Sequence, residues 1–354
     1  MIPDVWVVTA YRAGERAQIL ALAEALGWPF QIKEIKHKPK AWRTNIFRGS
    51  DLSGIDLQGS SSLTQPWPDL LISAGMRNEP VCRWIKAQSG GRSKIVHIGR
   101  PWARSDYFDL IITTPQYRLP ERVNILQNTT TLHRVTKQRL DEAAQLFSDE
   151  VSVLPGPYIA VIVGGNSGPY TLGKFAARRL AQQCNELAEK KGASLLITTS
   201  ARTSEVVAQA LETQISVPKH IYRWQKEGDN NPYFAYLALA DELVVTADSV
   251  SMLTEACATG KPVHMFDLGV GRNAMQHYSA ASGKNDFRLT GSFYRFAMAY
   301  APQRASRDIQ LVHHRLIEDG HAIWLGDQLA EKRPASLKAI DRAVACVKQL
   351  FPAG

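Results

Sequence analysis

Short apolar runs, each followed by a turn and a helical segment, recur along this chain. VWVVTA at 5–10 and YIAVIV at 158–163 are two of them. Apolar runs of this length are typical of parallel strands buried on both faces, and their alternation with helices predicts βαβ units. The sequence therefore predicts an α/β fold built on parallel sheets. The alternation of apolar runs and helical segments is interrupted at 149–157, which contains two prolines and a glycine, and then resumes.

The interruption at 149–157 predicts two domains. A chain of 354 residues is long enough for two domains of ordinary size. We expect an N-terminal α/β domain at 1–150, a hinge at 149–157 and a second α/β domain at 157–330.

The composition is that of a globular protein, with 45% hydrophobic and 21% charged residues. The first ten residues lack the basic start and the apolar length of a secretion signal, and no apolar run approaches the ~18 residues of a membrane span. We therefore expect a cytoplasmic protein, either free or bound peripherally to the inner face of the cytoplasmic membrane. The four cysteines have no metal-binding spacing and predict reduced, structural thiols: Cys82, Cys184, Cys257 and Cys346.

The net charge of +9 favours an anionic partner without identifying it. Much of the charge is concentrated at Lys33–Arg48, where Trp42, Ile46 and Phe47 are interleaved with six basic residues and one glutamate. Basic residues with apolar anchors suit an anionic membrane surface, but a solvated loop over the sheet explains them equally well. No recognisable nucleic-acid motif accompanies the tract.

A glycine-rich turn, GGNSG at 164–168, follows the first strand of the second domain. Such turns let a backbone approach a phosphate, and the N-terminus of the next helix faces the anion. The turn is not GxxxxGK[ST], which argues against P-loop hydrolysis of nucleoside triphosphates, and it is not GxGxxG. No acidic residue ends the next strand, where a ribose-binding one is expected. Arg202 lies there instead and could accept the phosphate of NADP, so a dehydrogenase stays open.

A second turn of this kind lies in ELVVTADSVSMLTEACATGKPVHMFD, at 242–267. Its pattern predicts a strand, a turn rich in hydroxyls, a short helix and another strand. Glu255 follows Ser251 by one helical turn, so both side chains point the same way. Taken alone, the stretch could be only a capped helix with a solvated glutamate. Because 164–168 should lie at the same edge of the same sheet, we favour a shared diphosphate site.

The N-terminal domain offers fewer candidates for chemistry. Gly14 and Glu15 lie in the turn after the first strand, at the sheet edge where ligands of open α/β sheets bind. Glu15 could act as a general base, or it could be only a favourable charge in a helix's first turn. His133 is a weaker candidate, because a lone histidine is more often structural.

The chain resembles the bacterial relatives of the plant elongated-mitochondria (mitochondrial fission) family, and its second half resembles the donor domain of GT-B glycosyltransferases. The resemblance covers about Val5 to Asp267. It rests on VVTAYRAGERAQILALAEALGWP, PWPDLLISAG, LHRVT, VGGNSG, LLITTSARTS, NPYFAYLALADELVVTADSVSMLTEACATGKPV and FDL. It implies two Rossmann-like domains facing a cleft. It also implies that a C-terminal segment, 331–354, contains a helix at about 336–350 that crosses back to the first domain.

The resemblance also implies roles for individual residues. The donor diphosphate would be held by the two turns, Glu255 would bind ribose hydroxyls, Arg202 would neutralise charge, and the loop at 224–233 would border the base. The Gly14 turn would approach the acceptor or the transferred sugar. The implied donor-site residues are Gly14, Gly164, Gly165, Asn166, Ser167, Arg202, Asn231, Ser249, Val250, Ser251 and Glu255. Several inverting enzymes of this fold place a histidine base in the N-terminal domain, where this sequence has Glu15.

Three functions remain open at this stage. The first is a metal-independent glycosyltransferase that uses a UDP-sugar or another nucleotide-sugar, with no cofactor, and a lipid-linked or cell-envelope acceptor at the cytoplasmic membrane face. The second is a nucleotide-sugar 2-epimerase of the same fold, which would need acid–base residues such as Glu15 and Glu79. The third is a non-catalytic membrane-associated scaffold that has kept the fold.

Overall fold

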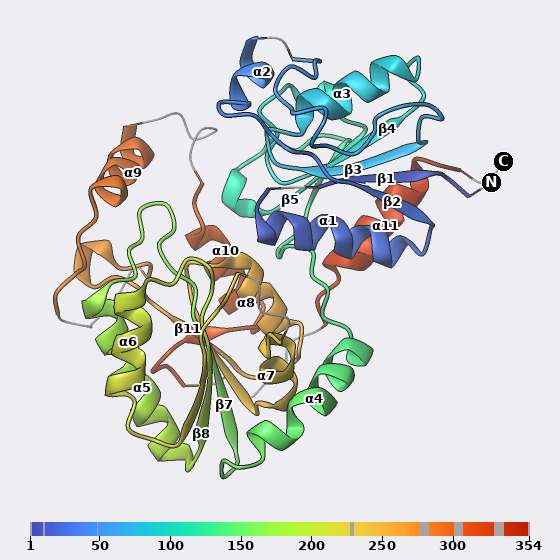
Figure 1. The fold of residues 1–354 in the computed structure, drawn as a ribbon. Coiled ribbons are helices and arrows are strands. Elements are labelled where there is room, and N and C mark those ends of the chain that lie inside the picture. Colours follow the sequence, from blue (N-terminus) through green and yellow to red (C-terminus); the bar gives the residue numbers. More distant parts are fainter. Residues whose placement is uncertain are drawn as a thin grey trace. The chain divides into compact units, whose positions relative to one another are not determined.

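The computed structural model describes residues 2–9, 11–47, 49–226, 230–276, 283–300, 307–328 and 336–352. Contacts between Cα atoms divide the chain into two compact units. Unit 1 comprises Met1–Arg134 together with Lys338–Gly354, and unit 2 comprises Val135–Leu337. Each unit contains one parallel sheet with helices on both faces (Figure 1).

The elements of unit 1 follow the apolar pattern of the sequence. In chain order they are β1 (Val5–Val8), α1 (Ala13–Leu26), β2 (Phe30–Lys33), α2 (Trp42–Phe47), β3 (Leu70–Ala74), α3 (Glu79–Gln88), β4 (Lys94–Ile98), η1 (Ser105–Tyr107), β5 (Leu110–Thr113), η2 (Pro115–Tyr117), β6 (Ile125–Gln127) and, from the end of the chain, α11 (Ala339–Gln349).

The sheet of unit 1 has the strand order β2-β1-β3-β4-β5-β6, with all neighbours parallel. Alternate residues of β1 serve opposite faces, as the period of two in a strand requires. Val5 and Val7 belong to the core under α1 and α11, whereas Trp6 and Val8 belong to the core under α3. The order reverses between β1 and β3, which makes this the topological switch point of the sheet.

Unit 2 repeats the plan with its own set of elements. They are α4 (Lys137–Val151), β7 (Tyr158–Ile162), α5 (Lys174–Lys191), β8 (Ser194–Thr198), α6 (Glu205–Gln214), β9 (Lys219–Tyr222), α7 (Tyr233–Leu239), β10 (Glu242–Thr246), α8 (Val250–Cys257), β11 (Val263–Phe266), η3 (Gly271–Asn273), α9 (Leu289–Tyr300), α10 (Gln310–Glu318) and β12 (Ile323–Trp324).

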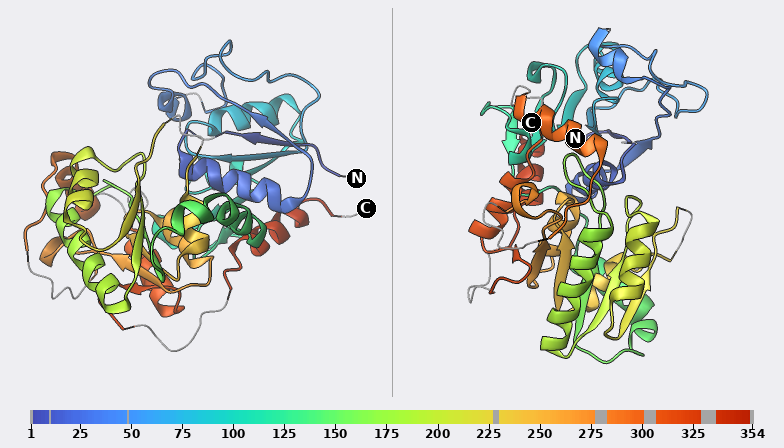
Figure 2. Two further views of the ribbon diagram at one scale, coloured as in Figure 1. Left: turned by 60° about the horizontal axis from the view of Figure 1, so that its bottom comes forward. Right: turned by 90° about the vertical axis from the view of Figure 1, so that its left-hand side faces the viewer.

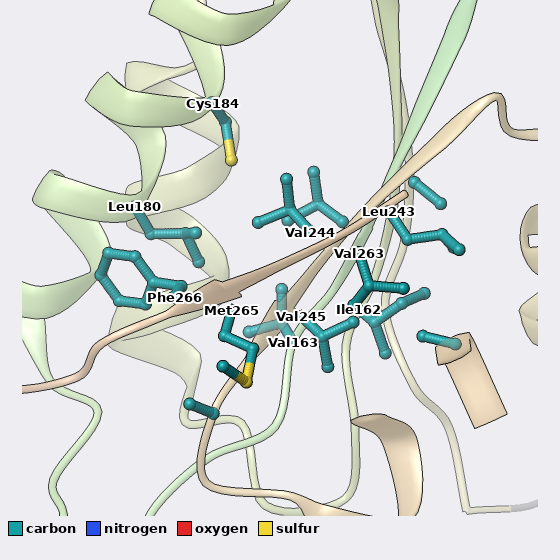
Figure 3. Close-up of a cluster of buried hydrophobic side chains, with 14 of the residues drawn as sticks. Ile162, Val163, Leu180, Cys184, Leu243, Val244, Val245, Val263, Met265 and Phe266 are labelled. Carbon is teal, nitrogen blue, oxygen red and sulfur yellow. The ribbon is translucent and has the colours of Figure 1, made fainter. Parts of the chain in front are cut away.

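The second sheet has the strand order β12-β11-β10-β7-β8-β9. Numbered within the unit and counted from β9, this is 3-2-1-4-5-6, the order of a doubly wound nucleotide-binding fold. Figure 3 shows the core on both sides of this sheet: Leu180 and Cys184 of α5 lie on the side to which Phe266 points, and Met265 points to the other. The switch point lies between β7 and β10.

The boundary between the units differs from the expected one. Residues 135–150, assigned from the sequence to the first domain, belong to unit 2. The reason is the packing of α4, which lies against α7 and places Arg139 over the ring of Phe234 at 5.0 Å. Because α4 continues to Val151, the residues from 149 onward begin as helix rather than as a hinge.

The C-terminal helix returns to the first unit, as the resemblance implied. Ala343 and Val347 of α11 are fully buried in the core that also contains Leu22 of α1. Figure 2 shows this red helix beside the blue α1 in its left-hand view. Residues 331–335 of the predicted C-terminal segment lie outside the described residues.

The structure adds elements that the sequence pattern did not predict, namely α2, α9, α10 and β12. None of the described helices is long and apolar enough to cross a membrane. Burial raises the pKa of Cys82, Cys184 and Cys257 to about 12, which agrees with structural thiols.

A buried histidine makes the stability of unit 2 depend on pH. Burial lowers the pKa of His313, on α10, to about 4, and its Nε2–H donates to the Ala247 carbonyl at 2.8 Å. Because the folded pKa is below the unfolded value of about 6.5, this contribution to stability is complete above that pH. It should be lost as the pH falls from about 6.5 to 4, by at most ~1.4 kcal/mol per pH unit.

Chemical denaturation across this pH range tests the prediction. His313→Gln retains a side-chain N–H donor without a titrating group and should flatten the pH dependence. Gln310 of the same helix does not titrate, so Gln310→Ala should leave the slope as in the wild type. An unchanged slope in His313→Gln would contradict the assignment.

Candidate functional site

The two turns singled out in the sequence flank the switch point of unit 2. Residues 164–168 follow β7, residues 247–249 follow β10, and these strands are neighbours. The Gly164 N–H donates to Thr246 Oγ1 at 2.7 Å, which joins the turns directly. Ligands of doubly wound sheets bind in the crevice at this position, outside the carboxyl ends of the strands.

Gly164 and Gly165 allow the neighbouring loops that carry Asp248 and Arg202 to pack very close to their Cα atoms. A Cβ on Gly164 would lie 2.4 Å from Asp248 Oδ1, and a Cβ on Gly165 would lie 2.1 Å from the Arg202 carbonyl oxygen. No side chain fits at these distances. The turn after β8 closes the same region, because Thr203 Oγ1 donates to the Gly164 carbonyl at 2.5 Å. The glycines therefore serve to pack three loops together.

Several N–H groups of the glycine turn are already engaged within the protein. Besides the bond from Gly164, the Gly165 N–H donates to Asp248 Oδ2 at 3.1 Å and the Ser167 N–H to the Tyr170 carbonyl at 3.1 Å. The side chain of Asn166 accepts from the Leu172 N–H at 2.9 Å. The turn shapes the switch point but offers fewer phosphate donors than its sequence implied.

Asp248 organises the site, and sequence reasoning missed this role. Its carboxylate is fully buried, accepts the N–H of Gly165, and lies 2.6 Å from Arg202 Nη1. Its other oxygen, Oδ1, has no hydrogen-bond partner among the described residues. Arg202 is about 39% exposed, so part of its guanidinium remains open to an anion at the switch point. The sequence signal was an aspartate just before a helix, which is equally typical of an ordinary N-cap.

Helix α8 presents an open N-terminus. Its N-cap residue, Ser249, makes no side-chain capping bond, so no described side chain satisfies the N–H groups of Val250 and Ser251 in that way. The first N–H groups of a helix, together with its dipole, form a ready anion site. The sequence predicted phosphate binding at this position.

Glu255 lies half-buried further along α8, where its Oε2 accepts from the Tyr233 hydroxyl at 2.5 Å. Burial and the neighbouring carboxylate raise the pKa of Tyr233 well above its ordinary value, so the tyrosine stays a donor. The bond orients the carboxylate. Asn231 fixes the start of α7, because its Oδ1 accepts the Tyr233 N–H at 3.0 Å. Residues 227–229 of the expected base-binding loop lie outside the described residues.

One expected phosphate donor is blocked. The glycine turn should lead directly into a helix whose N-terminus faces the ligand, but α5 begins only at Lys174. Its first N–H groups are taken by Asp286, which accepts from Gly173 at 3.1 Å, Phe175 at 3.0 Å and Ala176 at 2.9 Å. A carboxylate distant in sequence thus occupies the place predicted for a phosphate.

In unit 1, Gly14 and Glu15 also lie next to a switch point, the one between β1 and β3. Both residues belong to the first turn of α1, which starts at Ala13, so Gly14 is not in a loop as expected. Glu15 lies 3.4 Å from Arg12, and a Cβ on Gly75 would lie 2.7 Å from its Oε2. The positive φ of Gly75, 79°, permits this approach.

The remaining acid–base candidates of unit 1 differ in their surroundings. Glu79 is fully buried and accepts three hydrogen bonds, from the N–H groups of Trp102 and Ala103 and from Asn45 Nδ2, which ties a loop to α3. A carboxylate engaged in this way is structural, which weakens the epimerase hypothesis. His133 is half-buried in the segment between β6 and α4.

Part of the basic tract is engaged with the protein itself. Lys33 Nζ lies 3.9 Å from the ring centre of Trp6, and Lys36 pairs with Asp56 at 3.4 Å. Arg48 and the side chains of Trp42, Ile46 and Phe47 lie outside the described residues. Among the described residues, no three acidic, histidine or cysteine side chains are grouped as a metal site requires.

Together these features define an α/β protein with two Rossmann-like units, with glycine and polar residues at each switch point. The chain belongs to the mitochondrial fission ELM1 family, whose profile matches residues 13–291. It is 27% identical to the mitochondrial fission protein ELM1 of Arabidopsis thaliana over 238 residues, which are 61% of this chain and 55% of the plant protein. The chain thus spans little more than half the length of that relative.

Solved structures of sugar-nucleotide enzymes have a similar fold. UDP-GlcNAc 2-epimerase from Neisseria meningitidis, bound to UDP-GlcNAc, gives a TM-score of 0.48 at 12% identity and covers 98% of this chain and 100% of its own. ADP-heptose lipopolysaccharide heptosyltransferase II from E. coli gives a TM-score of 0.43 at 13% identity and covers 89% and 99%.

Proposed function

We propose that unit 2 binds a nucleotide-sugar at its switch point and that the protein is a glycosyltransferase. The observation that carries the proposal is the meeting of the 164–168 turn with the start of α8, outside neighbouring strands of a 3-2-1-4-5-6 sheet. This is the position at which such sheets hold a diphosphate.

Each contact has a proposed chemical task. The N–H groups of Val250 and Ser251 receive the phosphates, and the exposed part of Arg202 adds positive charge. Glu255, oriented by Tyr233, accepts hydrogen bonds from the ribose hydroxyls. The glycines and Asp248 set the shape of the loop rather than bind phosphate. This division of roles follows from which groups the protein already satisfies.

In the proposed reaction the bond between the sugar's anomeric carbon and the diphosphate oxygen breaks, and a bond to an acceptor hydroxyl oxygen forms. The acceptor proton passes to a base, for which Glu15 is our candidate, and the nucleoside diphosphate leaves with the bond's electron pair. The helix dipole and Arg202 stabilise that leaving group, so the proposal needs no metal. We propose a lipid-linked or envelope acceptor bound by unit 1 at the cytoplasmic membrane face.

Thermal shift with a panel of nucleotides and nucleotide-sugars tests the donor site. We expect at least one nucleoside diphosphate sugar to raise the melting temperature of unit 2. Glu255→Gln should weaken that ligand's affinity about tenfold or more, because it removes a charge-assisted hydrogen bond. Glu212→Gln is the matched control, since Glu212 lies on α6 and pairs with Arg223. Failure of every nucleotide to stabilise the protein would contradict the proposal.

A further inference from the structure

The switch point of unit 1 carries an arginine whose charge no described residue balances. Arg77 lies in the loop between β3 and α3, and its side chain is half-buried. The guanidinium carbon lies 4.5 Å from the ring centre of Tyr11, which lies in the turn between β1 and α1. Within the part of the chain that the structure describes, no oxygen accepts a hydrogen bond from this guanidinium and no acid pairs with it.

The neighbouring arginines differ from Arg77 because they have acid partners. Arg12 Nη1 lies 3.4 Å from Glu15 Oε1. Arg16 Nη2 lies 2.7 Å from Glu34 Oε1. A half-buried charge without a partner is costly, and buried charges in proteins are ordinarily paired. The charge of Arg77 therefore points to an anionic ligand rather than to an internal partner.

The loop that carries Arg77 adds backbone donors to the same place. Among the described residues, the N–H groups of Gly75, Met76 and Arg77 have no acceptor. The next N–H group, of Asn78, donates to the Gly75 carbonyl at 3.2 Å, which closes the loop into a turn. Gly75 has a φ of 79°, and successive N–H groups in turns of this left-handed kind form concavities that bind anions.

Contacts on the other side of the loop hold Arg77 at the switch point. The buried Asn78 donates from Nδ2 to the Thr9 carbonyl at 2.7 Å and to the Ala74 carbonyl at 3.1 Å. Because these bonds orient the amide, its Oδ1 accepts from His37 Nε2–H at 2.9 Å. Burial lowers the pKa of His37, and the charge of Arg77 lowers it further, so the ring is mainly neutral at pH 7.

The donors of this loop suit a phosphate group better than a carboxylate. A guanidinium is planar and forms paired hydrogen bonds with either anion. A phosphate group carries about 1.5 to 2 negative charges at pH 7 and has three strong acceptor oxygens, whereas a carboxylate has two oxygens and one charge. The guanidinium and three backbone N–H groups therefore match the larger and more highly charged anion.

We propose that the switch point of unit 1 binds a phosphate group of a ligand, through the Arg77 guanidinium and the N–H groups of residues 75–77. The inference rests on the proposed function for the ligand's role as acceptor, but phosphate binding here does not depend on the donor site of unit 2. Glu15, our candidate base, borders the same loop, because a Cβ on Gly75 would lie 2.7 Å from its Oε2. A phosphorylated acceptor held at Arg77 would lie beside that base.

Histidine NMR of the full chain tests the proposal, because His37 senses the charge of Arg77. His37→Gln identifies the signal. We expect inorganic phosphate to bind saturably and to raise the pKa of His37, since the bound anion offsets the neighbouring positive charge. Acetate at matched ionic strength should have no such effect, and high salt should weaken phosphate binding.

Two arginine variants make the test specific. Arg77→Gln should raise the pKa of His37 without any ligand, and it should weaken phosphate binding about tenfold or more because a charge-assisted contact is lost. Arg83 is the matched control, since it lies on α3, is half-buried and stacks 3.8 Å from the ring centre of Tyr107. Arg83→Gln should leave the His37 pKa and the phosphate affinity unchanged. Equal melting temperatures would show that both variants are folded.

Two phosphate esters distinguish the possible sources of the group. Farnesyl phosphate carries it on an apolar chain, and glycerol 3-phosphate carries it on a water-soluble one. Binding of farnesyl phosphate that is tenfold tighter or more would support the proposal with a lipid-linked ligand. Equal binding of both esters would support it with a water-soluble ligand.

Three results would overturn the proposal: no response of His37 to any of the phosphate compounds, an equal response to acetate, or wild-type phosphate affinity in Arg77→Gln. The same variants separate this site from the donor site. Arg77→Gln should retain the thermal shift caused by a nucleotide-sugar, and Glu255→Gln should retain the response of His37 to phosphate. Absence of nucleotide-sugar binding would contradict the proposed function and leave phosphate binding at Arg77 intact.

Discussion

Gly165→Ala should disrupt the switch point of unit 2 and abolish nucleotide-sugar binding there. The new Cβ would lie 2.1 Å from the carbonyl oxygen and 2.4 Å from the carbonyl carbon of Arg202. These are backbone atoms, so no side-chain rotation can relieve the clash. Overpacking of this kind typically costs 1–3 kcal/mol, and here it pushes the Arg202 turn away from the ligand position.

Calorimetry of the variant, with the transitions of the two units fitted separately, measures this effect. Gly156→Ala is the matched control in the same unit, because its Cβ would meet nothing closer than the Tyr158 ring at 3.8 Å. We expect that control to change the unfolding free energy by less than about 1 kcal/mol. A Gly165→Ala protein with wild-type stability and nucleotide affinity would show that the close approach has no role.

Asp248→Ala should destabilise unit 2 by about 2 kcal/mol, and Arg202→Ala should cost at least as much. Both changes remove the 2.6 Å ion pair, but only the first also removes the acceptor of the buried Gly165 N–H. Arg202 is 39% exposed, so water can solvate its guanidinium when Asp248 is removed. Arg202→Ala instead leaves the fully buried Asp248 carboxylate without its cationic partner, and that uncompensated charge outweighs the lost backbone hydrogen bond.

A double-mutant cycle measures the coupling free energy between Asp248 and Arg202. Asp248→Asn retains an oxygen that can accept the Gly165 N–H, so it should be closer to wild type in stability than Asp248→Ala. A cost for Arg202→Ala well below that of Asp248→Ala would show that the buried carboxylate tolerates the loss of its cationic partner and would contradict this assignment.

The strands could be predicted well from the sequence because buried parallel strands have a strong local signature. The apolar runs at 94–98, 158–163 and 194–198 lie at or within one residue of the observed β4, β7 and β8. The C-terminal helix at about 336–350 and its return to the first domain were both expected from the resemblance rather than from a local pattern.

Contacts between distant residues could not be read from local patterns. Asp286 caps α5 across more than a hundred residues, and α4 joins unit 2 because of its packing on α7. The role of Asp248 was hidden for a related reason. An aspartate before a helix has the same local appearance whether it caps that helix or accepts an N–H group from a turn 83 residues away.

At the proposed donor site, too, local patterns could be predicted and contacts between distant residues could not. The positions of the two turns could be predicted, because the carboxyl ends of neighbouring parallel strands lie at one edge. Which N–H groups remain for a ligand could not be predicted, because that depends on Thr246, Asp248 and Tyr170 as internal acceptors. Sequence reasoning therefore placed the two turns at one sheet edge, but it assigned to phosphate binding N–H groups of the glycine turn that are already bonded within the protein.

A crystal structure with a stabilising nucleoside diphosphate sugar bound tests the central claim most directly. We predict phosphate oxygens within hydrogen-bond distance of the Val250 and Ser251 N–H groups, with ribose hydroxyls at Glu255 and a guanidinium contact from Arg202. Phosphates bound away from the start of α8, with Glu255 and Arg202 touching no part of the ligand, would contradict the proposed donor site.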